Sequence, residues 1–199
     1  MESAGNLSLL FKAMFKDVLN RIDPSGKLRL SSVRVVPSFV LVQRGILEGV
    51  NLVCFTLGDP PEAIVAFRFD YSRAWEDILK SNIDVLHSAD PMAIINSLLK
   101  EVGNIIVGPL STRLSKVLGK ETLPSVPFAV GSVEDLEKLL RMMGEKVLPV
   151  FEGTISDGHL GSIEVCVIPS RHLLHELNSN PEVRGRVRWY IKKIRGEGR

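Results

Sequence analysis

The chain has 199 residues, of which 45% are hydrophobic and 24% charged, and its net charge is +2. These proportions are typical of a water-soluble globule with a real core, and no apolar run reaches the roughly 18 residues that a membrane-spanning helix needs. The N-terminal segment MESAGNLSLLFK has no basic start followed by an apolar stretch and a cleavage site, so we expect a cytoplasmic protein. Cys54 and Cys166 lie in apolar runs and are expected to be reduced core residues.

The first half of the chain is predicted to contain a long helix, a strand that ends at Pro37, a strand hairpin and a short helix. The hairpin is the segment LVCFTLGDPPEAIVAFRF, with Gly58 to Pro61 as its turn. The short helix is YSRAWEDILKSN, which ends at Asn82.

The second half is predicted to begin with the longest helix of the chain. Asp90 is suited to be its N-cap and Pro91 its first residue, and Gly119 is expected at the position after its C-terminus. A strand ending at Pro127 should follow, and then the short helix SVEDLEKLLRMM, capped by Ser132.

The end of the second half is predicted to be another hairpin and another short helix. The hairpin is VFEGTISDGHLGSIEVCVI, in which Asp157-Gly158 is a strong turn signal between β-rich runs. The helix lies in PSRHLLHELNSN, which ends at Asn180. Apart from the short helix after Pro127, the two halves therefore contain the same succession of elements.

Residue identities repeat between the halves as well. Ser72, Arg73, Leu79, Ser81 and Asn82 recur as Ser170, Arg171, Leu177, Ser179 and Asn180. All five pairs are separated by 98 positions, whereas upstream the separation falls to about 90 and places Pro37 on Pro127. The difference predicts that the short helix after Pro127 is an addition to the second half.

This repetition predicts an α+β fold, an internally duplicated pseudo-twofold unit in which an antiparallel sheet is covered by two long helices and short helices. We expect one domain over residues 1–183. Within it lie a degenerate first half, about 6–82, and a second half that bears the site, about 90–180. Residues 184–199 would form a basic C-terminal tail.

The predicted tail holds seven Lys and Arg against one Glu, so the rest of the chain is net negative. It is either a solvated extension, part of which forms a short docked helix, or a contact for an acidic partner, a membrane surface or nucleic acid. No nucleic-acid-binding motif accompanies it, so we expect no nucleic-acid partner.

The long helix of the second half carries a stripe of small and polar residues. At 100° per residue, the stripe comprises Ser97, Glu101, Asn104, Gly108, Ser111 and Ser115. It is either an ordinary solvated face or a site that presents a carboxylate and an amide to another protein. Gly103 is expected to point to the packed side and to admit a neighbouring helix. Pro109 should kink or split the helix.

The spacing Ser97-x3-Glu101-x2-Asn104-x22-Pro127 resembles the signature of the CheC/CheX/FliY family of chemotaxis phosphatases. The resemblance implies hydrolysis of the aspartyl phosphate of a CheY-type response regulator at a single active site. Glu101 and Asn104 would then be catalytic, and Ser97 and Pro127 would support them. The resemblance further implies no metal or cofactor in this chain, with Mg²⁺ on the partner regulator, and a CheD-like protein as a second candidate partner.

At the separation of 90, the first half has Leu7, Phe11, Met14 and Pro37 in the places of these four residues. The first half is therefore predicted to have no catalytic site. The alternative function is a non-catalytic CheC- or FliM-like binding or scaffold protein that docks CheY- or CheD-like partners.

Overall fold

A computed structural model describes residues 2–31, 33–48, 50–70, 91–144, 147–156 and 162–195. Its helices are α1 (Glu2–Ile22), α2 (Ser38–Glu48), α5 (Pro91–Leu118), α6 (Val133–Met142), α7 (Arg171–Ser179) and α8 (Pro181–Arg195). Its strands are β1 (Arg29–Leu30), β2 (Arg34–Pro37), β3 (Leu52–Leu57), β4 (Ala63–Asp70), β5 (Phe128–Val130), β6 (Pro149–Ser156) and β7 (Ser162–Pro169). All strand pairs are antiparallel, in the order β1-β6-β7-β4-β3-β5 with β2 also on β6. The predicted α+β class is confirmed.

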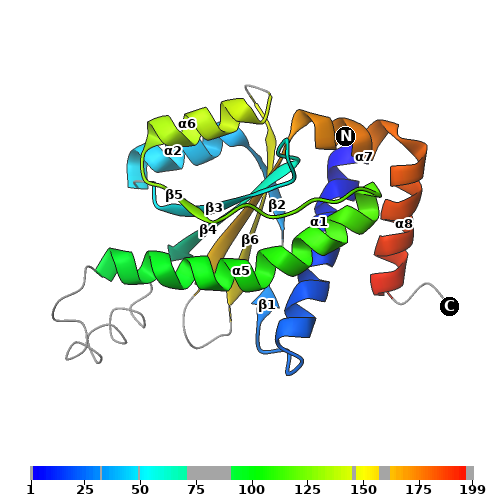
Figure 1. Cartoon of the computed structure of the whole chain (residues 1–199), viewed down its shortest axis with the longest axis horizontal. Helices are drawn as coiled ribbons and strands as arrows, with labels where there is room; N and C mark the ends of the chain where they lie inside the picture. The colour runs from blue at the N-terminus through cyan, green and yellow to red at the C-terminus, as the bar shows by residue number, and fades with distance from the viewer. Residues whose placement is uncertain are drawn as a thin grey trace.

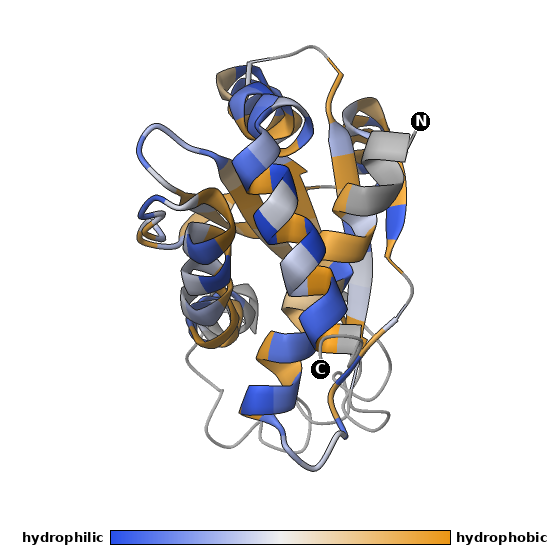
Figure 2. Ribbon diagram, turned by 90° about the vertical axis from the view of Figure 1, so that its right-hand side faces the viewer, coloured by the Kyte–Doolittle hydropathy of each residue, from blue (hydrophilic) through white to orange (hydrophobic). Residues whose placement is uncertain are grey.

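The sheet has a hydrophobic core on each face (Figure 1). Phe55 and Phe67 point to the face that α1, α5, α7 and α8 cover, whereas Cys54 and Ala66 point to the face under α2 and α6. Consecutive strand residues point to opposite faces, so a strand buried on both faces is a continuous apolar run. Figure 2 shows these strands in the colour of hydrophobic residues, while the helices carry both colours.

The register between β4 and β7, the central strand pair, has the twofold symmetry expected if the two halves are related by a separation of 98 residues. Phe67 pairs with Val165, its own counterpart 98 positions later. Ile64 pairs with Ile168 and Asp70 pairs with Ser162, so the pairing is unchanged when the two halves are exchanged. The internal duplication itself stays an interpretation of this symmetry.

Two details of the predicted repeat are wrong. The first half has a short helix of its own, α2, in the place of α6, so α6 is no addition to the second half. The strand of the second half, β5, begins after Pro127 instead of ending there. Proline has no backbone N–H to donate to a neighbouring strand, and this restricts it to strand starts and edges.

The strand pairing also separates Pro37 from Pro127. Phe128 pairs with Cys54, and Arg34 pairs with Glu152, which lies 98 positions after Cys54. Arg34 and Phe128 therefore hold matching places in the sheet, 94 positions apart, and the separation of 90 that placed Pro37 on Pro127 does not hold there.

The basic segment begins inside a helix that is part of the core. The predicted boundary between residues 183 and 184 falls within α8, which is continuous from Pro181 to Arg195. Val187 and Tyr190 are buried in the core that α1 and α5 share. The docked helix expected within the predicted tail is therefore present as α8, which begins before residue 184 and packs through apolar residues at helical spacing.

The caps predicted for α5 and α6 are present where the structure describes them. The Ser132 hydroxyl accepts a hydrogen bond from the backbone N–H of Asp135, and Gly119 has a φ of +74° just after α5. The predicted cap Asp90, the helix ending at Asn82 and the turn Asp157-Gly158 lie outside the described residues.

Both cysteines are free and buried, as predicted. Burial raises the pKa of the Cys54 thiol to about 12 and also raises that of Cys166. The reactive form of cysteine is the thiolate. We therefore expect neither thiol to react with a disulfide reagent at pH 8 in the native protein, and both to react in denaturant. Rapid labelling of either thiol before unfolding would contradict this packing.

Candidate functional site

The polar stripe of α5 is exposed along its N-terminal half. Ser97, Glu101 and Asn104 are exposed, while Leu99 and Ile106 of the same helix are buried in the core. Glu101 and Asn104 are three residues apart, so they lie one turn from each other on one helical face. The structure therefore presents a carboxylate and an amide outward from a helix that the sheet holds from behind.

Gly103 explains how α5 lies so close to the sheet. A Cβ atom at this position would lie 2.4 and 2.6 Å from two ring atoms of Phe55, and 3.4 Å from the ring of Phe67. The predicted neighbouring helix is thus wrong, because the close neighbour is an aromatic ring from β3. The glycine next to Asn104 is needed for packing and lets the exposed pair stand on a helix seated directly against the strands.

Pro109 does not split α5, which is one helix from Pro91 to Leu118. Figure 1 shows that the helix changes direction along its length. Proline removes the hydrogen bond to the carbonyl four residues earlier, here that of Ile105, and this residue is 55% exposed. A Cβ before proline disfavours helical geometry, and Gly108 has none. The pair Gly108-Pro109 is therefore accommodated just after Asn104.

The C-terminal half of the stripe is covered by the chain that follows α5. The Ser115 hydroxyl lies 2.7 Å from the Thr122 hydroxyl, and the Thr122 backbone N–H donates to Ser115 Oγ over 2.9 Å. The Ser111 hydroxyl donates to the backbone carbonyl of Thr122. Ser111 and Thr122 are both buried. These serines are thus structural, and the sequence pattern alone did not distinguish them from Ser97.

The segment 119–127 is also tied to β3. The Ser125 backbone N–H donates to the Thr56 carbonyl over 2.9 Å, and Ser125 Oγ accepts from the Thr56 N–H over 2.9 Å. Because Gly103 lies against Phe55, the next residue of β3, this segment and the middle of α5 both flank the same strand. The segment ends at Pro127, which is half-buried directly before β5.

A buried carboxylate anchors the beginning of this segment. Glu62, directly before β4, is 4% exposed and forms an ion pair with Lys120. Its other oxygen lies 3.0 Å from Nδ1 of His172 on α7. Burial acts to raise the pKa of Glu62, but the hydrogen bonds and charges of Lys120 and His172 outweigh it, so that the pKa lies below its ordinary value. No sequence pattern predicted this cluster, because its members are far apart along the chain.

The lowered pKa of Glu62 makes stability depend on pH. A carboxyl whose pKa is lower in the folded state stabilises the protein above its unfolded pKa, near 4.5, and loses that contribution as pH falls through the folded value. We expect Glu62→Gln to lower the free energy of unfolding at pH 7, with the difference from wild type shrinking below about pH 4.5. Urea unfolding at pH 7, 5 and 3.5 measures this. A difference that stays constant with pH would contradict it.

The first half presents no matching pair on α1. Leu7, Phe11 and Met14 are apolar and all lie in the core, none of them more than 4% exposed. Among the described residues, no group of three or more His, Cys, Asp or Glu side chains is placed to hold a metal ion. The part of the chain that the structure describes also contains no helix long and apolar enough to cross a membrane.

Comparison with known proteins connects this site to one family. The model of the CheC-like family matches residues 94–130, which include all four signature positions. No curated protein sequence matches the chain at a significant level. The fold is similar to that of FliY from Thermotoga maritima, with a TM-score of 0.55 and 15% identity over 97% of each chain. It is also similar to that of FliM in a complex with SpeE from H. pylori, with a TM-score of 0.58 and 13% identity over 90% of this chain and 96% of that one.

The fold is an α+β fold similar to those of FliY and FliM, and the segment that carries the candidate site matches the CheC-like family model. Over residues 94–130, and in its fold, the chain is similar to the CheC/CheX/FliY family. At identities of 13–15%, the solved structures establish the fold, and the site is argued from this chain's own residues.

Proposed function

We propose that the chain is a phosphatase that hydrolyses the aspartyl phosphate of a CheY-type response regulator. The observation that carries the proposal is the exposed pair Glu101 and Asn104 on a helix whose packing against β3 leaves this face open. The pair lies within the segment that the CheC-like family model matches.

In this reaction the chain's main task is to position the attacking water against the phosphoryl group of the regulator. A water molecule attacks the phosphorus, the bond between phosphorus and the aspartyl oxygen breaks, and the products are inorganic phosphate and the free carboxylate of the regulator. An amide has both a donor and an acceptor, so Asn104 orients the water in line without taking its proton. The regulator's own Mg²⁺ and Lys neutralise the phosphoryl oxygens.

Glu101 anchors the partner in this proposal. Its carboxylate pairs with a cation of the regulator beside the phosphoryl group, most simply the same Lys. A charge-assisted hydrogen bond of this kind fixes register as well as adding affinity. Ser97, one turn before Glu101, leaves room for the approach, and Pro127 shapes the edge of the site.

Exposed apolar side chains on α5 and in the segment that follows it favour a protein partner. Ile105 is 55% exposed, and in the segment after α5 Leu123 and Val126 are 64% and 84% exposed. Interfaces are centred on apolar contacts that exclude water around a few polar groups. A folded regulator would cover these residues, which a small substrate would leave in water.

The second candidate is a non-catalytic binding or scaffold protein for CheY- or CheD-like partners. The fold similarity to FliM and the proline one turn beyond Asn104 favour it. The apolar residues around the stripe serve docking in either case.

Phosphate release separates the two candidates. A CheY-type regulator is phosphorylated with acetyl phosphate, freed of the donor, and followed with and without this chain. The proposal expects release to accelerate at substoichiometric amounts of the chain. Binding of the phosphorylated regulator without acceleration would overturn catalysis in favour of the scaffold function.

A further inference from the structure

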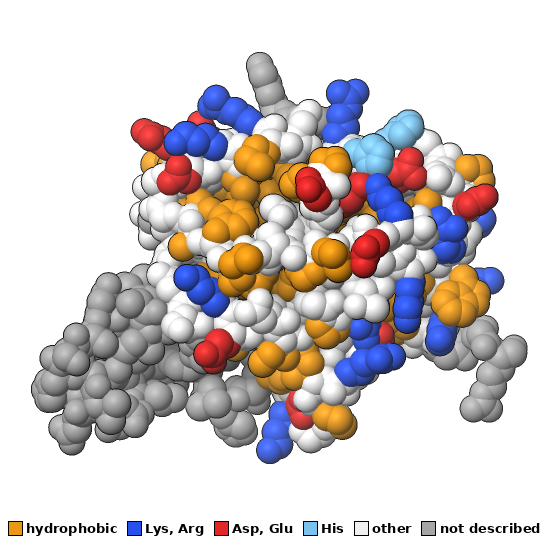
Figure 3. Space-filling view, in the orientation of Figure 1, with side chains coloured by type: hydrophobic (Ala, Val, Ile, Leu, Met, Phe, Trp, Pro, Cys, Tyr) orange, Lys and Arg blue, Asp and Glu red, His pale blue; other side chains and the backbone are white. Residues whose placement is uncertain are grey.

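A pocket lies between α1, α5 and α8, at the end of α5 away from Glu101 and Asn104. Its volume is about 280 Å³. The charged residues that line it are Asp17, Arg21, Arg113, Lys116, Arg186 and Lys193. In Figure 3, Lys and Arg side chains gather over the right-hand part of the molecule, where Figure 1 places α8. The pocket is therefore strongly cationic.

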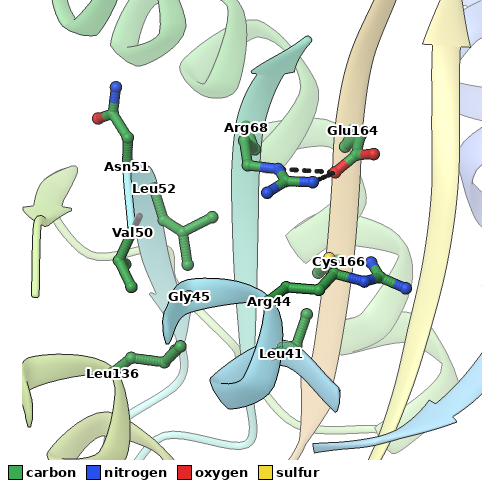
Figure 4. Close-up of a pocket in the computed structure, with 10 residues that line it drawn as sticks. All are labelled: Leu41, Arg44, Gly45, Val50, Asn51, Leu52, Arg68, Leu136, Glu164 and Cys166. Carbon is green, nitrogen blue, oxygen red and sulfur yellow. Dashed lines mark hydrogen bonds and ion pairs between the residues drawn. The ribbon is translucent and has the colours of Figure 1, made fainter. Parts of the chain in front are cut away.

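In the pocket on the opposite face of the sheet, by contrast, the arginine charges are balanced by carboxylates (Figure 4). There Arg68 lies 2.8 Å from Glu164 and 2.9 Å from Glu48. Arg44 lies 2.9 Å from the buried carboxylate of Glu152. Each guanidinium that lines that pocket has a carboxylate partner. These arginines therefore form structural ion pairs and do not attract a further anion.

Arg113 is the central cation of the pocket beside α8 and is only 6% exposed. Its Nε donates to Asp17 over 2.5 Å, and its Nη1 donates to the backbone carbonyl of Pro109 over 2.8 Å. Its Nη2 is buried and has no hydrogen-bond partner among the described residues. A buried donor of a charged group that lacks a partner is costly, and an anion in the pocket would supply the missing acceptor.

The other charges of the pocket do not compensate for Arg113. Asp17 is the one carboxylate among the described lining residues, and it also lies 3.8 Å from Arg21. Neither Lys116 nor Lys193 forms an ion pair with a described residue. The pocket thus holds an excess of positive charge, which favours an anionic ligand.

An aromatic ring completes the lining. Trp189 of α8 is 62% exposed, and the ammonium group of Lys193 lies 4.9 Å from the centre of its ring. An exposed indole beside cationic groups offers a flat surface on which a planar ring can stack. Both side chains lie at the solvent side of α8, where they can turn to admit a ligand.

We propose that this pocket binds a small phosphate ester that carries a planar ring, of the size of a mononucleotide. The phosphate group contacts Arg113, Lys116 and Lys193, and the ring stacks on Trp189. The volume of about 280 Å³ lies just below the roughly 300–1,000 Å³ of typical small-molecule sites, so the ligand can be no larger than a mononucleotide. This site is independent of the proposed phosphatase activity.

The test is titration calorimetry of the full chain at low ionic strength, with AMP and with inorganic phosphate as probes. We expect AMP to bind and phosphate to bind more weakly. The double variant Lys116→Gln/Lys193→Gln should weaken both probes by about tenfold or more. Trp189→Leu should weaken AMP and leave phosphate unchanged. AMP should also raise the midpoint of thermal unfolding of the wild type.

The matched control is Lys138→Gln/Arg141→Gln, which removes two cations from α6 on the opposite face of the sheet. It should bind both probes like the wild type. No binding by the wild type, or an equal loss in the two double variants, would overturn the proposal. AMP that binds no more tightly than phosphate would exclude the planar ring.

Discussion

Asn104→Ala is expected to lower the rate of regulator dephosphorylation by about 100-fold or more, because the amide is the group that orients the attacking water. The side chain is exposed, so its loss should leave the fold intact. The measurement is single-turnover phosphate release at saturating protein, since this isolates the chemical step from docking. The matched control is Asn20→Ala, which removes an exposed amide from the other long helix and should keep full activity.

Glu101→Gln should act at a different stage of the same reaction. The substitution removes the charge but keeps the size, so we expect the concentration for half-maximal rate to rise more than the maximal rate falls. Glu134→Gln, an exposed carboxylate on α6, serves as its control.

Asn104→Ala with wild-type activity would show that another group positions the water, and the phosphatase proposal in its present form would fail.

Gly103→Ala is expected to destabilise the protein, although alanine is the better helix former. Alanine would contribute about 1 kcal/mol through helix propensity, but its Cβ would lie 2.4 Å from the Phe55 ring. That ring is fully buried and packs edge-on against Phe67, so it has nowhere to move. Overpacking of this kind costs about 1–3 kcal/mol or more, so we expect a net loss in the free energy of unfolding of about 1–2 kcal/mol.

The contrast is Gly185→Ala in α8. A Cβ there would have nothing within 4 Å, so helix propensity acts alone and stability should rise by about 0.5–1 kcal/mol. Urea unfolding of both variants measures the difference. The double variant Gly103→Ala/Phe55→Leu should recover part of the loss, because the two side chains compete for one space. Equal and positive effects at both glycines would show that α5 does not lie this close to β3.

The exposed part of the site could be predicted from the sequence because it is local. Glu101 and Asn104 are brought together by one helical turn, and the periodicity of apolar residues in α5 decides which face points to solvent. Leu7, Phe11 and Met14, which were expected in the places of Ser97, Glu101 and Asn104, are apolar and lie in the core. The hairpins and the caps at Ser132 and Gly119 followed from equally short-range rules.

The errors arose where distant segments decide the outcome. Helix α2 was missed because it follows β2 without an intervening turn, and its apolar residues are also compatible with a strand. The partner of Gly103 was assigned to a helix because sequence spacing shows only that a close approach is needed. Ser111 and Ser115 belong to the same stripe as Ser97, and only their bonds to Thr122 distinguish a structural serine from an exposed one.

The sequence by itself determined the α+β class, the pairing of Glu101 with Asn104 on one helical face and the resemblance to the CheC-like family, because each depends on residue types at short, fixed spacings. Only the tertiary structure decided that α8 is part of the core and that Glu62 contacts Lys120 and His172. It also decided that the carboxylate of Asp17 is shared by Arg113 and Arg21. The contacts of Glu62 and the contact between Asp17 and Arg113 join residues from about 60 to more than 100 positions apart. Such contacts are set by how the helices pack on the sheet, and no local pattern encodes that arrangement.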